Sequence, residues 1–244
     1  MLYRLFSLFF LSILITLTTL ANANANVADL FDEVLSPQIK DGFVRYDLID
    51  KNKLDTLVAA VADYKIDIKG DEKTLAFYLN AYNILAVKGI VDGDGPHSLL
   101  SRYTFFKGNK YTVAGTEMNL DTLEHKVIRP LKEARVHFAL VCAAASCPPL
   151  RSEAYRANIL DEQLNDQAIT FINNKDKNSF DAEKKRSNLS SIFKWFKEDF
   201  LLEADSLNQY IASFVKDESL KAALANNEFS VKFNKYDWSL NGKR

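Results

Sequence analysis

The chain has 244 residues, and its 31 lysines and arginines nearly balance its 32 aspartates and glutamates, giving a formal net charge of −1. Neither sign dominates any long stretch, and the basic run at residues 184–186 is typical of a solvated loop. Nucleic-acid binding needs a clustered basic surface. We therefore expect no nucleic-acid partner.

The N-terminus has the pattern of a secretory leader. Residues 5–20 carry no charge and follow Arg4, and residues 21–25 alternate alanine with asparagine, which offers two small-x-small cleavage sites. The apolar run is shorter than the roughly 20 residues that span a bilayer, so a cleaved signal peptide over residues 1–25 is favoured over an uncleaved anchor. No cysteine directly follows the run, which argues against a lipoprotein. We expect a periplasmic or secreted protein with no stable membrane insertion after cleavage.

Helical spacing of apolar residues predicts helices over residues 27–35 and 51–64, and residues 42–46 alternate like a short strand between them. Residues 75–91 are apolar around most of a helical circumference, which predicts a buried central helix. Asn80 and Asn83 in its middle then need hydrogen-bond partners. Their amides could bind a substrate carbonyl or tie the helix to loop backbone, and we favour the second role.

The second half of the chain continues with mixed elements. Residues 97–115 predict a long loop with a hairpin that includes a strand at 111–113, and residues 119–132 predict a helix that carries Glu124 and His125. Further helices are predicted over 155–173, after an N-cap at Ser190 or Ser191, and over 205–215 and 217–225, followed by a strand at 229–233. We expect an α+β fold over residues 26–244, a single mainly helical domain packed on a small, largely antiparallel sheet.

Both cysteines lie close to a histidine in one short segment. Residues 136–141 are apolar and partly β-branched, which predicts a buried strand that begins near His137 and ends at Cys142. Pro148 and its neighbouring proline exclude regular helix around Cys147. We therefore expect both thiols on loop backbone held by a rigid strand, a common setting for chemistry.

Two interpretations of Cys142 and Cys147 compete. In an oxidising compartment a structural disulfide is the default. Alternatively, one thiol is a nucleophile activated by an imidazole. Five residues of strand would separate His137 from Cys142 by about 16 Å, so His125 is the better partner.

Three further residues are candidates around such a site. Glu124 or Asp237 could orient the imidazole, although Glu124 could equally be a solvated surface charge. Arg135 could bind an anionic substrate or bridge an internal acid such as Asp237. The histidines are widely spaced and form no ligand motif, so we expect no metal and no cofactor.

Several separated segments resemble the DUF547 family, whose name carries no function. They are residues 75–83, 120–129, 135–142, 146–148, 190–200 and 236–241, together with Tyr155. The motif-bearing part therefore spans residues 70–241. A weaker resemblance in arrangement, to papain-like and transglutaminase-like thiol enzymes, implies a cysteine at the start of the buried helix, and this chain has none there.

These observations lead to two hypotheses. In the first, the exported DUF547-type protein is a thiol-dependent acyl hydrolase or transferase acting on a small-molecule or peptide substrate, with Cys142 or Cys147 as nucleophile and His125 or His137 as base. In the second, it is a non-catalytic envelope binding or interaction domain with a structural Cys142–Cys147 disulfide. A sulfur pair at bonding distance and remote from both imidazoles would exclude the nucleophile. The sequence indicates no particular oligomeric state.

Overall fold

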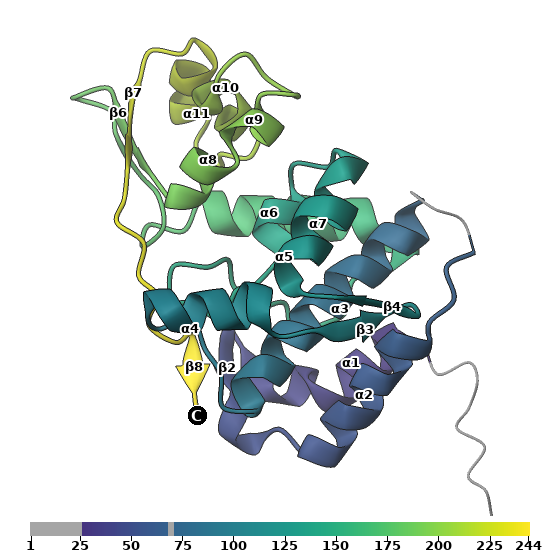
Figure 1. Cartoon of the computed structure of the whole chain (residues 1–244). Coiled ribbons are helices and arrows are strands. Elements are labelled where there is room, and N and C mark those ends of the chain that lie inside the picture. Colours follow the sequence, from purple (N-terminus) through teal and green to yellow (C-terminus); the bar gives the residue numbers. More distant parts are fainter. Residues whose placement is uncertain (1–25, 68–70) are drawn as a thin grey trace, which may run out of the picture.

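The computed structural model of the chain describes residues 26–67 and 71–244 (Figure 1). The predicted signal peptide of residues 1–25 lies outside the described residues. The first three α-helices are α1 (Val27–Val34), α2 (Lys51–Asp63) and α3 (Glu72–Val91), which pack against one another. Asn26, Asp50 and Asp71 cap their N-termini by accepting backbone N–H groups.

Helix α3 is the central helix of the fold. Among the described residues it alone is long and apolar enough to cross a membrane, and 83% of that stretch is buried inside the fold. Its burial on nearly all sides, with Leu79, Ala81 and Ile84 fully covered, identifies it as a core helix. The predicted central helix is therefore confirmed.

Short helical segments connect α3 to the second half of the chain. They are α4 (Leu99–Tyr103), a π-helical turn (Thr104–Gly108), α5 (Leu120–Thr122), a second π-helical turn (Leu123–Ile128), a 3-10 turn (Arg129–Leu131) and α6 (Val136–Ala139). After these come α7 (Leu160–Ile172), α8 (Ser191–Trp195), α9 (Lys197–Phe200), α10 (Leu207–Ala212) and α11 (Glu218–Ala225). Other 3-10 turns cover Ser36–Gln38, Tyr46–Leu48 and Ala157–Ile159.

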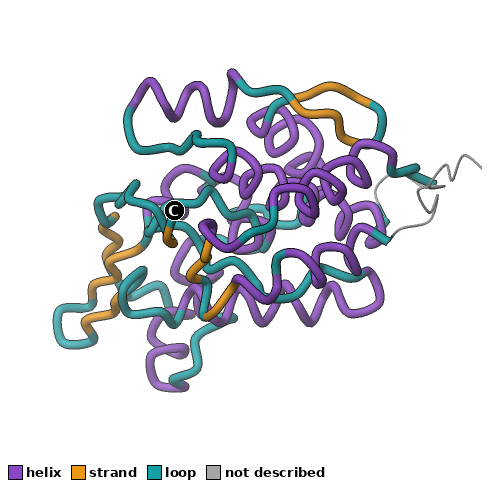
Figure 2. The backbone as a smooth tube through the Cα atoms, turned by 90° about the horizontal axis from the view of Figure 1, so that it is seen from below, coloured by secondary structure: helices purple, strands orange, loops and turns teal. Residues whose placement is uncertain are grey.

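The strands form three small sheets that lie at separate places around the helices (Figure 2). In the first, β2 (Phe43–Arg45) pairs antiparallel with β1 (Ile39–Lys40) and parallel with β8 (Gly242–Lys243). Strands β3 (Tyr111–Val113) and β4 (Thr116–Met118) form a hairpin. In the third sheet, β6 (Arg186–Leu189) pairs antiparallel with β5 (Ser179–Asp181) and parallel with β7 (Ser230–Phe233).

Strand β8 returns the C-terminus to the first part of the chain, beside β2 (Figure 1). Gly242 allows this close approach, because a Cβ atom there would lie 2.1 Å from the carbonyl oxygen of Val44. As a result, the segment between β7 and β8 runs from the third sheet to the first.

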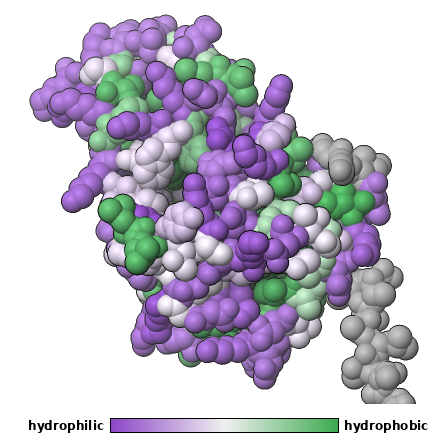
Figure 3. Space-filling model, in the orientation of Figure 1, coloured by the Kyte–Doolittle hydropathy of each residue, from purple (hydrophilic) through white to green (hydrophobic). Residues whose placement is uncertain are grey.

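Buried side chains form two hydrophobic cores. The larger one surrounds α3 and includes Cys147, and the smaller one surrounds Phe138 of α6 and includes four more fully or almost fully buried rings, Phe171, Phe193, Phe200 and Tyr210. The face of the molecule seen in Figure 1 is mostly hydrophilic, with hydrophobic residues in small separate patches (Figure 3). Tyr236 packs against both cores.

The α+β class is confirmed, with the β-structure divided among three sheets. Two local predictions are wrong. Residues 136–139 form one helical turn instead of a strand, because a short, fully buried apolar run has no periodicity that separates the two. Residues 99–108 are helical rather than loop, and Ser98 begins α4 with a capping box to Ser101.

Candidate ligand-binding pocket

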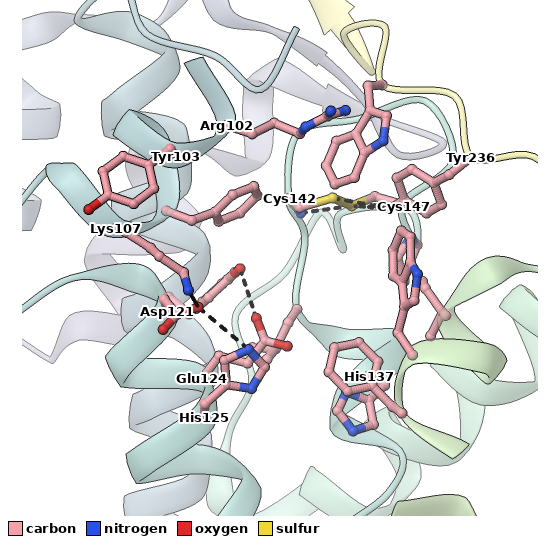
Figure 4. Close-up of a pocket in the computed structure, with 18 residues that line it drawn as sticks. Arg102, Tyr103, Lys107, Asp121, Glu124, His125, His137, Cys142, Cys147 and Tyr236 are labelled. Atoms are coloured by element: carbon pink, nitrogen blue, oxygen red, sulfur yellow. Dashed lines mark hydrogen bonds and ion pairs between the residues drawn. A yellow bond between two sulfur atoms is a disulfide. The ribbon is translucent and has the colours of Figure 1, made fainter. Parts of the chain in front are cut away.

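A cavity of about 340 Å³ lies between the two cores, where α3, the π-helical turn Leu123–Ile128, the loop after α6, α8 and the C-terminal segment meet (Figure 4). Its walls include seven phenylalanine, tyrosine or tryptophan rings, those of Tyr82, Tyr103, Phe106, Trp195, Phe196, Tyr236 and Trp238. Trp195 and Trp238 are the only tryptophans of the chain. Aromatic walls with a few polar groups are typical of small-molecule sites.

Three of these rings pack closely on one side of the cavity. The ring centroids of Tyr236 and Trp238 are 4.6 Å apart, and those of Trp195 and Tyr236 are 4.7 Å apart. The guanidinium of Arg102 lies 4.5 Å from the Trp238 centroid, a cation–π contact. Because Tyr236 and Trp238 belong to the segment before β8, the return of the C-terminus builds this wall.

The Cys142–Cys147 disulfide forms another part of the wall (Figure 4). The two Cα atoms are 6.0 Å apart, within the usual range for a disulfide. The Tyr236 hydroxyl lies 3.2 Å from one sulfur and 3.1 Å from the other. Within residues 26–67 and 71–244 neither imidazole hydrogen-bonds a sulfur, and there is no free cysteine.

Backbone contacts hold the disulfide loop against the C-terminal segment. The amide of Ala145 donates to the carbonyl of Ser239, and the amide of Ser146 donates to the carbonyl of Asp237. Ala143 has a positive φ of 58°, which turns the chain between the cysteines. The loop therefore brings the two sulfurs together through backbone geometry and not through the expected strand.

His137, on α6, is almost fully buried and stacks on Phe196 with ring centroids 3.8 Å apart. Its Nε2 lies 2.7 Å from a carboxylate oxygen of Asp199, and Arg129 donates two hydrogen bonds to the same carboxylate at 2.7 and 2.9 Å. These donors hold the pKa of Asp199 well below its ordinary value. Burial lowers the pKa of His137, so the ring is neutral at pH 7. Asp199 therefore orients His137, in place of the predicted Glu124 or Asp237.

His125 lies at the same end of the pocket as His137, on the π-helical turn (Figure 4). Arg129 donates a hydrogen bond of 3.1 Å to Nδ1 of His125. The Nε2 atom of His125 lies 3.7 Å from a carboxylate oxygen of Asp121. An arginine can only donate, so Nδ1 is the acceptor and Nε2 carries the proton of the neutral ring. Burial lowers the pKa of His125.

Glu124 lines the pocket, so the interpretation of this residue as a solvated surface charge is wrong. Its carboxyl group accepts a hydrogen bond of 3.3 Å from the hydroxyl of Tyr82 on α3. Burial raises the pKa of Glu124 to about 7. The position of Glu124 on its helix could not predict this burial, because Tyr82 and the C-terminal segment, which are distant in sequence, enclose the carboxyl group.

Asn80 and Asn83 use their amides on loop backbone and do not line the pocket. Asn80 exchanges two hydrogen bonds of 2.8 Å with the backbone of Tyr155. Asn83 donates to the carbonyl of Ala139 at 3.0 Å and accepts from the amide of Val141 at 2.9 Å. Each satisfied amide fixes a loop to α3, and Asn83 positions the chain just before Cys142.

Arg135 and Asp237 also lie outside the pocket lining. Arg135 pairs with Glu133 and Asp161, so the expected bridge to Asp237 is not formed. Asp237 is solvent-exposed and accepts from the amide of Ser239 at 2.9 Å. Across the described part of the chain, no group of three or more His, Cys, Asp or Glu side chains is placed to hold a metal ion.

A glutamine at position 124 should change how stability depends on pH. The folded-state pKa of Glu124 is raised, so the folded chain holds this proton more tightly than the unfolded chain, and stability falls as pH rises through about 7. The free energy of unfolding of Glu124→Gln, measured relative to wild type, should increase by about 2 kcal/mol from pH 5 to pH 8. Urea unfolding at both pH values measures this, with exposed Glu198→Gln as the control. An equal difference at the two pH values would contradict it.

Together the fold and the site define an α+β domain with an aromatic-lined cavity partly closed by a disulfide. Residues 67–172 match the model of the DUF547 family, described as a protein of unknown function. This range contains α3, the helical segments that carry His125 and His137, and both cysteines. The resemblance to DUF547 is thus confirmed for residues 67–172, whereas the motifs at residues 190–200 and 236–241 lie beyond the matched range. The chain matches no curated protein and no solved structure.

Proposed function

We propose that this protein is an exported, non-catalytic domain that binds a small organic ligand in the aromatic pocket, with the Cys142–Cys147 disulfide as a structural crosslink of the pocket wall. The observation that carries the proposal is an aromatic-lined cavity of about 340 Å³ whose two sulfurs are bonded to each other. Small-molecule sites of proteins have volumes of roughly 300–1,000 Å³ and are lined mainly by apolar and aromatic side chains.

The polar groups of the pocket support binding over nucleophilic chemistry. A cysteine nucleophile needs a thiolate and an imidazole to activate it. Here both sulfurs are oxidised, and the hydrogen bonds of the imidazoles go to Arg129 and Asp199. Such bonds fix the rings as parts of the wall.

Thiol-dependent acyl hydrolysis or transfer is the second candidate. One observation favours it, namely that both sulfurs, His125 and His137 line the same cavity. A reductant of the dithiol class would first have to open the disulfide by thiol–disulfide exchange. The candidate therefore applies to the reduced protein.

The disulfide and the leader pattern together support export, because disulfides persist in oxidising compartments. Mass analysis of the mature chain after cell fractionation tests this. We expect an N-terminus after Ala23 or Ala25 in the exported fraction, and an intact leader in the cytoplasmic fraction would contradict export.

Binding can be measured with N-phenyl-1-naphthylamine, a neutral dye whose fluorescence rises in apolar cavities. We expect saturable binding to the oxidised protein, with a dissociation constant that changes less than about threefold in the Cys142→Ser/Cys147→Ser double variant, because no covalent bond to sulfur is needed. Absence of saturable binding would overturn the proposal. Iodoacetamide-reactive thiols in the native protein, together with ester hydrolysis that the double variant lacks, would establish the second candidate instead.

A further inference from the structure

Most of the ionisable groups around the pocket already have partners within the protein. Lys107 lies 3.4 Å from Asp121, which also faces His125. Arg129 is bound by the carboxylate of Asp199. These pairs neutralise one another inside the wall, so none of them requires a charged ligand.

Glu124 is the exception among the pocket carboxyl groups. Within residues 26–67 and 71–244 no lysine, arginine or histidine lies within ion-pair distance of it, and its hydrogen-bond partner is the phenol of Tyr82. The carboxyl group of Glu124 points into the space enclosed by the labelled residues of Figure 4. A partly buried carboxylate without a cation is costly, and a cation that enters the pocket would offset this cost.

The aromatic walls suit a cation as well. The faces of tryptophan and tyrosine rings attract positive charge through their quadrupoles. Two such contacts already exist at rings of the pocket, Arg102 over Trp238 and Arg129 over Phe196. The rings of Trp195 and Tyr236 supply further faces around the same space.

We propose that the pocket binds an organic cation, an ammonium or quaternary ammonium compound with an apolar body, whose charge lies against Glu124 and the ring faces while its body packs on the aromatic wall. This assignment of ligand class rests on the proposed function of a small-molecule binding domain. Burial of Glu124 beside a phenol, with no lysine, arginine or histidine of the described residues within ion-pair distance, is the feature that sets the sign of the ligand charge.

An anionic ligand fits the same charges less well. Its natural partners, Arg102 and Lys107, are engaged by Trp238 and Asp121. It would also lie close to Glu124, and two like charges in a partly buried site repel each other. The charge pattern therefore favours the cation.

Binding of the cation should depend on the protonation of Glu124. The groups that face this residue come from several elements packed around it. They are Tyr82 on α3, Asp121, His125 and Arg129 on its own helical segments, Lys107, Asp199 on α9 and Tyr236 near the C-terminus. Burial lowers the pKa of His125, so its imidazole is mainly neutral at pH 7 and above, where Glu124 becomes ionised. The charge that changes near neutral pH is then that of Glu124.

The test uses phenyltrimethylammonium and tert-butylbenzene, which differ by the replacement of a charged nitrogen with carbon. Each competes with N-phenyl-1-naphthylamine on the full oxidised protein. We expect Glu124→Gln to lower the affinity for phenyltrimethylammonium about tenfold at pH 8, and to change the affinity for tert-butylbenzene by less than about twofold. Wild-type affinity for the cation should rise about tenfold from pH 5.5 to pH 8.5, and that of Glu124→Gln should stay flat.

Asp121→Asn is the matched control, since it removes a pocket carboxylate that already has partners in Lys107 and His125. We expect it to change cation affinity less than about threefold. The cation assignment would be overturned if Glu124→Gln lost affinity equally for both probes, or lost none for the cation. Dye binding by the wild type would then still support the pocket. Absence of dye binding in wild type would overturn the proposed function itself.

Discussion

Replacement of Phe138 by alanine is expected to lower the free energy of unfolding by about 3–5 kcal/mol, the usual cost of removing a buried aromatic side chain. Phe138 is fully buried. Its ring centroid lies between 5.2 and 5.6 Å from those of three other phenylalanines, Phe171, Phe193 and Phe200. Four helices lose a shared contact at once, so little relaxation can fill the cavity.

Urea unfolding at pH 7 measures this change. Phe233→Ala is the control, because Phe233 is 38% exposed on β7 and its loss should cost less than about 1 kcal/mol. A Phe138→Ala variant that loses no more stability than this control would show that the smaller core does not depend on Phe138. Since His137 precedes Phe138 on α6, the variant should also weaken dye binding.

Asp199→Ala is the second substitution with a large expected effect, a loss of roughly 2–4 kcal/mol at pH 7. It would leave the buried imidazole of His137 and the guanidinium of Arg129 without their common acceptor. The folded-state pKa of Asp199 is lowered, so its contribution is present above the ordinary aspartate pKa and is lost only as pH falls through the folded value.

The difference between wild type and Asp199→Ala should therefore be constant from pH 5 to pH 8 and shrink only in stronger acid. Chemical denaturation across this range measures it. Glu198→Gln, at the exposed neighbouring position, should stay within about 0.5 kcal/mol of wild type. A difference that vanishes between pH 5 and pH 8 would contradict the assigned role of Asp199.

Much of the local structure is predictable from the sequence, because short-range patterns determine it. The apolar residues of α3 and the capping side chains of Asp71 and Ser190 specify their helices within a few residues. The backbone role of Asn80 and Asn83 also follows from burial, since buried amides require partners. The disulfide is the default pairing for two nearby cysteines in an exported protein.

The candidate site is less predictable, because contacts distant in sequence create it. Asp199 is 62 residues from His137, and no local pattern links them. Glu124 becomes buried only when α3 supplies Tyr82 and the C-terminal segment supplies Tyr236 and Trp238. The distance estimated between His137 and Cys142 assumed a strand, where the chain instead forms a helical turn.

Titration of the oxidised protein with N-phenyl-1-naphthylamine, followed through tryptophan emission, tests the central claim that this cavity is a ligand site. Both tryptophans of the chain line the cavity, so energy transfer to the dye reports its location. The account predicts saturable transfer and an affinity about tenfold lower in Trp195→Ala, whereas Leu202→Ala, exposed and outside the lining, should bind like wild type. Dye binding that leaves tryptophan emission unchanged, or that is equal in both variants, would contradict it.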